Sequence, residues 1–170
     1  MHKDTTISSY LLNMGRASRE AARFLRMASG ATKDRALTMI ADRLSAGKEQ
    51  VLSANQEDMV IARDAGAEPH ILDRLLLTSE RLDGIIQAIK GIVALPNPIG
   101  EEFDVRSLPN GLRVGRRRVP LGVIGTIYES RPNVTIDIAV LCLKSGNASI
   151  LRGGKEAIHS NRALISVIRE

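Results

Sequence analysis

The chain has 170 residues, of which 44% are hydrophobic, 25% charged and only 2% aromatic, which excludes intrinsic disorder and requires an aliphatic core. Its net charge of +5 would suit a nucleic acid, a membrane surface or a phosphorylated small molecule. The basic cluster at residues 113–118 contains no aromatic side chain for base stacking, and no apolar run reaches the roughly 20 residues that a bilayer needs. We therefore expect neither a nucleic-acid partner nor a membrane.

The first two predicted segments are helices. The first is expected to begin after Ser8 or Ser9, either of which can cap it, and to end at Gly30. Thr32 is expected to cap the second, which ends at Gly47. Both carry apolar stripes at helical spacing, which we interpret as core packing. The stripes are Leu11, Met14, Ala21, Leu25 and Ala28 in the first helix, and Leu37, Ile40, Ala41 and Leu44 in the second.

Helices continue to about residue 100. A third is expected over residues 48–65, followed by a short apolar turn from Pro69 and a last helix capped by Thr78 or Ser79. The Pro-Asn-Pro stretch at residues 96–98 ends that helix, because proline removes a backbone donor and restricts the residue before it.

Residues 103–119 predict a β-hairpin. Asn110-Gly111 separates two short apolar-rich runs, and this pair is a strong hairpin signal because both residues tolerate positive φ. The basic cluster at residues 113–118 falls on the second strand. We interpret it as solvated charge on an edge strand, where it discourages aggregation.

Strands and helices then alternate. Residues 119–128 predict a strand buried on both faces, residues 134–144 a helix, residues 148–151 a second buried strand, and the segment from Ala157 another helix. This order predicts a parallel sheet with a right-handed crossover. The expected fold class is therefore α/β, with a helical N-terminal segment and a hairpin arm before the sheet.

Two predicted loops follow the carboxyl ends of the strands, where parallel sheets bind ligands. In the loop at residues 152–156, two glycines allow close approach to the backbone, and Arg152 and Lys155 add positive charge. The next helix is expected to offer free N–H groups to an anion. A phosphate-bearing ligand fits this loop, and an ordinary glycine turn with solvated cations fits it equally well.

The other loop, residues 129–133, contains Asn133, whose side-chain amide can donate to a developing oxyanion or cap the next helix. Arg131 can pair with a carboxylate or phosphate in forked geometry. Cys142, the single cysteine, falls on the apolar face of a helix and is interpreted as a buried small hydrophobe. The three histidines lack metal-ligand spacing, so we expect no metal. With no apolar leader, the composition favours the cytoplasm.

Several stretches resemble the γ-glutamyl phosphate reductase family, a branch of the aldehyde dehydrogenase superfamily. They are residues 117–125, 127–135, 142–147 and 151–156, together with Asn55-x-x-Asp58, Leu72-Asp73-Arg74-Leu75 and residues 96–100. The resemblance covers essentially the whole chain. It implies NADPH-dependent reduction of γ-glutamyl phosphate to glutamate 5-semialdehyde, with release of phosphate, in proline biosynthesis.

The resemblance also implies roles for individual residues. Asn133 matches the asparagine that holds the oxyanion, and Arg131 is expected to contact the substrate. The residues expected at the cofactor site are Ile127, Arg152, Gly154 and Lys155. NAD-using relatives carry an acidic residue where this chain has Lys155, so a cation there favours the 2′-phosphate of NADP by charge complementarity.

The domain organisation follows from the same resemblance. It implies a helical part of the cofactor domain over residues 1–100, an oligomerisation arm over residues 101–119, and the start of a Rossmann-like NADP-binding sheet over residues 120–170. The nucleophilic cysteine of the family lies in a catalytic domain expected beyond residue 170, so this chain is expected to be inactive alone. The oligomerisation arm implies a homo-oligomer. The loop at residues 129–133 is two residues longer than in the wider superfamily, which leaves the geometry of Asn133 open.

Three other interpretations remain. The chain could belong to another dehydrogenase of the superfamily, to the reductase half of a fused kinase–reductase, or to a short non-catalytic protein that binds a nucleotide or assembles with a partner.

Overall fold

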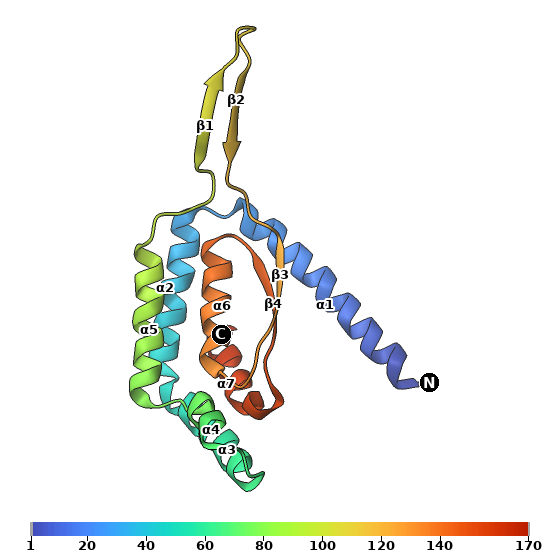
Figure 1. The fold of residues 1–170 in the computed structure, drawn as a ribbon, viewed down its shortest axis with the longest axis vertical. Coiled ribbons are helices and arrows are strands. Elements are labelled where there is room, and N and C mark those ends of the chain that lie inside the picture. Colours follow the sequence, from blue (N-terminus) through green and yellow to red (C-terminus); the bar gives the residue numbers. More distant parts are fainter. Residues whose placement is uncertain (1, 170) are drawn as a thin grey trace.

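The computed structural model describes residues 2–169, which form a helical body, a projecting hairpin and a small parallel sheet (Figure 1). The first half contains α1 (His2–Met27), α2 (Gly30–Ala46), α3 (Lys48–Asp64), α4 (Pro69–Leu75) and α5 (Ser79–Ala94). The second half contains β1 (Glu102–Ser107), β2 (Arg113–Arg117), β3 (Val123–Ile127), α6 (Pro132–Lys144), β4 (Ala148–Arg152), the 3-10 turn η1 (Lys155–Ala157) and α7 (Ile158–Arg169).

α1 differs from its prediction in both extent and burial. It begins at His2 rather than after Ser8 or Ser9, and it ends at Met27, before Gly30. Its apolar stripe is not core packing, because α1 crosses the sheet and then projects past the body (Figure 1). The large apolar side chains that it leaves exposed are Ile7, Tyr10, Leu11, Leu12, Phe24 and Met27.

The other helix ends show how local caps decide a boundary. α2 is capped by Ser29 rather than Thr32, since Ser29 Oγ accepts the Thr32 N–H at 3.1 Å. Gly47 ends α2 as predicted. Thr78 caps α5, and its Oγ1 accepts the Arg81 N–H at 3.2 Å.

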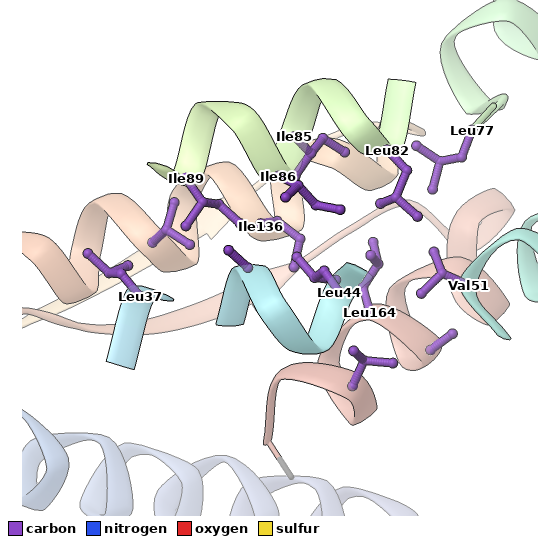
Figure 2. Packing of buried hydrophobic residues seen from close by; sticks show 14 residues of the cluster. Leu37, Leu44, Val51, Leu77, Leu82, Ile85, Ile86, Ile89, Ile136 and Leu164 are labelled. Atoms are coloured by element: carbon purple, nitrogen blue, oxygen red, sulfur yellow. The ribbon is translucent and has the colours of Figure 1, made fainter. Parts of the chain in front are cut away.

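The core is aliphatic, as the composition predicts, and lies between α2, α5, α6 and α7 (Figure 2). Leu37 and Leu44 of α2 meet Leu82 of α5, Ile136 of α6 and Leu164 of α7, and all five are fully buried. Burying one such side chain contributes about 2 kcal/mol relative to leaving it in water. The predicted stripe of α2 is therefore confirmed as core packing.

The hairpin stands away from the body (Figure 1), and its strands β1 and β2 pair antiparallel. The Leu108 N–H donates to Leu112 O at 2.8 Å, and Gly111 has φ 85°, the positive φ that the Asn-Gly signal predicts. Every residue of both strands is exposed. The basic cluster on β2 is therefore solvated, as the sequence indicates.

β3 and β4 form the predicted parallel pair, with α6 as the crossover between them. The prediction of a strand over residues 119–128, buried on both faces, is wrong. β3 spans only Val123–Ile127, because Gly122 at φ 115° breaks the extended backbone before it. The residues of β3 are partly buried or exposed. In the described residues, β4 is its one neighbour.

Candidate functional site

The parallel register brings the two predicted loops to one edge of the sheet. Ile127 lies opposite Arg152, and the Tyr128 N–H donates to Arg152 O at 3.0 Å. A Cβ placed on Gly154 would lie 3.3 Å from the backbone N of Ser130. The loops at residues 129–133 and 152–156 are therefore in contact at the carboxyl ends of the strands, where such sheets bind ligands.

The glycines of the second loop lie where space is tight. Gly154 has φ −61°, which any residue can adopt. A Cβ there would lie 2.5 Å from Glu156 Oε2, the end of a flexible side chain that can move, and 3.3 Å from the fixed backbone of Ser130. A Cβ on Gly153 would overlap the side-chain amide of Asn161 and lie 3.0 Å from the Tyr128 ring. Because contacts closer than about 3 Å are repulsive, these glycines let the two loops pack against each other.

The first turn of α7 already holds an anion, which is a carboxylate of the protein. Asp58 of α3 accepts the His159 N–H at 3.1 Å and the Ser160 N–H at 2.8 Å. It also accepts the Ser160 hydroxyl at 2.6 Å. The expectation that this helix offers those N–H groups to a ligand is wrong, because a residue about 100 positions earlier in the chain has taken them.

Arg152 and Lys155 provide the positive charge of the loop. Arg152 ends β4 and Lys155 begins η1, and both are exposed. Within residues 2–169, neither side chain makes an ion pair, so both charges are available to an anionic ligand. Ile127 is 80% exposed beside Arg152 and adds an apolar surface next to the cations.

The first loop places Asn133 inside a helix. Pro132 takes the first helical position of α6, which suits proline, and Arg131 is the exposed cap residue before it. The interpretation of Asn133 as the helix cap is therefore wrong. Its Nδ2 donates to Asp137 Oδ2 at 3.1 Å. Burial raises the pKa of Asp137, and the hydrogen bond from Asn133 partly offsets that rise.

Cys142 is 4% exposed on α6, and burial raises the pKa of its thiol. A covered, protonated thiol is a poor nucleophile, so the interpretation of Cys142 as a buried hydrophobe is confirmed. Among residues 2–169, no group of three or more His, Cys, Asp or Glu side chains could hold a metal ion. No helix in this described range is both long and apolar enough to cross a bilayer.

Sequence reasoning missed the polar network behind the loops. Thr135 Oγ1 donates to Asn161 Oδ1 at 2.6 Å and lies 2.5 Å from the Tyr128 hydroxyl. Since the single hydrogen of Thr135 points to Asn161, Tyr128 must be the donor of the second bond. The network joins the end of β3 to α6 and α7. The available signal was a polar residue, Thr135, at a core-facing position of a predicted helix.

Comparisons with known proteins agree with this architecture. No protein-family model matches the chain. The γ-glutamyl phosphate reductase of Photobacterium profundum is 54% identical over 159 residues, which cover 94% of this chain and 38% of that protein. This chain therefore spans well under half the length of that relative.

Solved structures give the same result. The γ-glutamyl phosphate reductase of Thermotoga maritima is 43% identical with a TM-score of 0.91, and the match covers 94% of this chain and 38% of that one. The Saccharomyces cerevisiae enzyme of the same name is 32% identical with a TM-score of 0.88, covering 92% and 40%. A Bacillus subtilis structure described as an aldehyde dehydrogenase is 15% identical with a TM-score of 0.70. The match covers 94% of this chain and 33% of that one, and it shows the shared fold alone. By sequence and by fold, this chain is similar to part of the γ-glutamyl phosphate reductases, and it shares the fold of the aldehyde dehydrogenases.

Proposed function

We propose that this chain forms the cofactor side of a cytoplasmic enzyme that reduces γ-glutamyl phosphate to glutamate 5-semialdehyde, releasing phosphate, in proline biosynthesis. The observation that carries the proposal is the pair of exposed cations, Arg152 and Lys155, at the carboxyl edge of the β3–β4 pair. That edge belongs to a chain 54% identical to a γ-glutamyl phosphate reductase. The buried, single Cys142 is in keeping with a reducing compartment.

The residues at this edge fit NADPH, which supplies the hydride when it is bound. Arg152 and Lys155 lack internal ion pairs within the described chain, and a guanidinium beside an ammonium complements a phosphate. The 2′-phosphate is the group that distinguishes NADPH from NADH. Gly154 keeps side-chain bulk away from the loop, and the exposed Ile127 offers apolar contact to the cofactor.

Asn133 and Arg131 are proposed to act on the substrate. An amide nitrogen carries two hydrogens, and within residues 2–169 one of those on Asn133 is donated to Asp137. The other can donate to the oxyanion that develops when the acyl carbonyl is attacked. Arg131 is exposed at the start of α6 and can pair with an anionic group of the substrate.

The hairpin, residues 101–119, is proposed to be an oligomerisation arm. Its strands are exposed along their whole length, and two-stranded ribbons leave unpaired backbone groups along both edges. Val105, Leu112 and Val114 add exposed apolar side chains. Such an arm can be covered by a second copy of the chain.

Lys155→Glu is the experiment that tests the cofactor assignment. Placing a carboxylate opposite a 2′-phosphate introduces repulsion, so we expect the ratio of the association constant for NADPH to that for NADH, measured by direct titration of the chain, to fall by roughly tenfold or more. Lys90→Glu, at an exposed position of α5, is the matched control and should leave the ratio unchanged. An unchanged ratio in Lys155→Glu would refute recognition of the 2′-phosphate by this residue.

A further inference from the structure

Asp58 is a buried carboxylate whose two oxygens both serve α7. It is 1% exposed, and its three hydrogen bonds go to His159 and Ser160 in the first turn of α7. Gly154, which precedes η1, has no side chain to cap the helix. The cap of α7 is therefore supplied from a distant helix, α3, and not by the loop next to it.

Asn55 lies one turn earlier on α3 and strengthens the same junction. Its side chain accepts the Leu77 N–H at 2.7 Å and donates to Leu75 O at 2.8 Å. It also donates to Ser160 Oγ at 3.0 Å. Because Ser160 in turn donates to Asp58, α3 holds both the start of α7 and the chain between α4 and α5 through one buried network.

This junction lies close to the proposed cofactor loop. Only residues 153–158 separate Arg152, at the end of β4, from His159, whose backbone Asp58 holds. Within that stretch, Ala157 is fully buried against Met59 and Ala62 of α3. η1 is therefore docked on α3 by packing and by the hydrogen bonds of Asp58, and Lys155 is the first residue of η1.

We propose that Asp58 is a positioning residue for the anion site formed by Arg152 and Lys155. It docks η1 and α7 on α3, and it occupies N–H groups that would otherwise attract an anion. Recognition of a ligand phosphate is thereby left to the two cationic side chains. This inference rests on the cofactor role proposed for the loop and adds the residue that sets its geometry.

The test is a titration of the whole chain with 2′,5′-ADP and with 5′-AMP, which differ only in the 2′-phosphate. Asp58→Asn keeps the size of the side chain but removes its charge and one of its acceptor oxygens. We expect the preference of the chain for 2′,5′-ADP to fall roughly tenfold in this variant, because Lys155 is no longer held in place. Asp64→Asn, at an exposed position of the same helix, is the control and should keep the wild-type preference.

A purely electrostatic role predicts the opposite sign. If Asp58 acted only as a nearby negative charge, Asp58→Asn would bind 2′,5′-ADP more tightly. Tighter or unchanged binding in the folded variant overturns the positioning role. In a double-mutant cycle with Lys155→Ala, the two losses should not add, since both act through Lys155; additive losses overturn that route.

Failure of the variant to fold and failure of the proposed cofactor role can be told apart. Where circular dichroism shows that Asp58→Asn does not fold, Ser160→Ala removes the two hydroxyl bonds of the same network, to Asp58 and from Asn55, while the two backbone bonds to Asp58 remain. It should lower the preference by a smaller factor, and no change overturns the inference. A wild-type chain with no preference for 2′,5′-ADP instead overturns the proposed cofactor role, and the positioning role with it.

Discussion

At the scale of single residues, the hydrogen bond between Asn133 and Asp137 affects both the pKa of the acid and the orientation of the amide. Burial raises the pKa of the Asp137 carboxyl, whereas the hydrogen bond from Asn133 Nδ2, at 3.1 Å, favours the ionised form. In return, the carboxylate fixes the direction of the Asn133 amide. The proposed oxyanion donor is therefore oriented by a partly buried acid one turn along the same helix.

Asn133→Ala should make stability more dependent on pH, because the pKa of Asp137 rises further without its donor. A carboxyl with a raised folded-state pKa contributes stability that is fully present below the ordinary Asp pKa of about 3.9. That stability is lost as the pH rises through the folded-state pKa. We therefore expect the variant to melt below the wild type at neutral pH, with the gap closing toward about pH 4. A gap that is equal at every pH would assign the loss to packing.

The same variant separates a catalytic role of Asn133 from a structural one. Removing one oxyanion donor lowers the chemical rate on the order of a hundredfold. In a complete reductase that also contains the proposed catalytic domain, we expect kcat for the reduction of γ-glutamyl phosphate to fall by that factor while KM changes little. Asn13→Ala, at an exposed position of α1, is the control. Normal activity of the folded fraction would contradict the oxyanion role.

At the scale of elements, a partly buried ion pair and a hydrogen bond join α2, α5 and α6. Lys144 Nζ of α6 lies 2.7 Å from Asp34 Oδ1 of α2 and donates to Val93 O of α5 at 3.0 Å. Lys33 is buried nearby and donates to Asn97 Oδ1 at 3.2 Å. Burial lowers the pKa of Lys33, which the charge of Asp34 opposes and the charge of Lys144 reinforces. Asp34 therefore stabilises two covered cations.

Removing the two partners of this pair should have unequal effects. Asp34→Ala leaves Lys144 charged and covered, so we expect a loss of about 2–3 kcal/mol in the free energy of unfolding. Lys144→Met should cost less, because Met fills the space and the side chain of Asp34, 33% exposed, still reaches water. Denaturant unfolding measures both. Lys48→Met, in the exposed pair with Asp83, is the control and should cost under about 1 kcal/mol. Equal losses for Asp34→Ala and Lys144→Met would contradict this account.

At the scale of the whole molecule, the body, the hairpin and α1 are exposed to different degrees. The core of the body is closed by α2, α5, α6 and α7, whereas the hairpin and much of α1 project beyond it (Figure 1). These two segments carry many of the exposed large apolar side chains. Exposed apolar side chains on segments that project from the body are candidates for protein–protein contacts.

The proposed oligomer should therefore depend on the hairpin. We expect Leu112→Glu combined with Val114→Glu to lower the molar mass measured by light scattering after size-exclusion chromatography, because each buries a charge in the proposed contact. Leu121→Glu places the same charge at a site 86% exposed but outside the arm, and it should leave the mass unchanged. The proposed role of the hairpin as an oligomerisation arm would be contradicted if the wild-type protein is a monomer. An equal molar mass for the wild type and the double variant would contradict it as well.

Much of the fold was predictable because its signals are local. Gly47, Thr78 and the Pro-Asn-Pro stretch ended or began helices where the sequence placed them, and Asn110-Gly111 turned the hairpin. Periodicity identified the stripe of α2 correctly. It was misleading for α1, because a helical stripe does not tell which surface will cover it.

The candidate site was predictable in part. The sequence placed Arg152, Lys155 and Asn133 in two loops after parallel strands, and the register of β3 and β4 brings those loops together. It did not predict that the N–H groups in the first turn of α7 are already hydrogen-bonded, because the carboxylate that caps them comes from α3. Its alternative interpretation of Asn133 as a cap is wrong, because α6 starts at Pro132, two residues before the expected helix.

The sequence by itself therefore determined the kind and order of the elements, the aliphatic core and the cationic loop, since each depends on neighbours a few residues apart. Only the tertiary structure decided which groups are free to act. Asp58 meets the α7 terminus at 2.8 Å across about 100 residues of chain, and this contact arises from the packing of α3 against α7. Contacts of that range are set by how the elements pack, which no local pattern encodes.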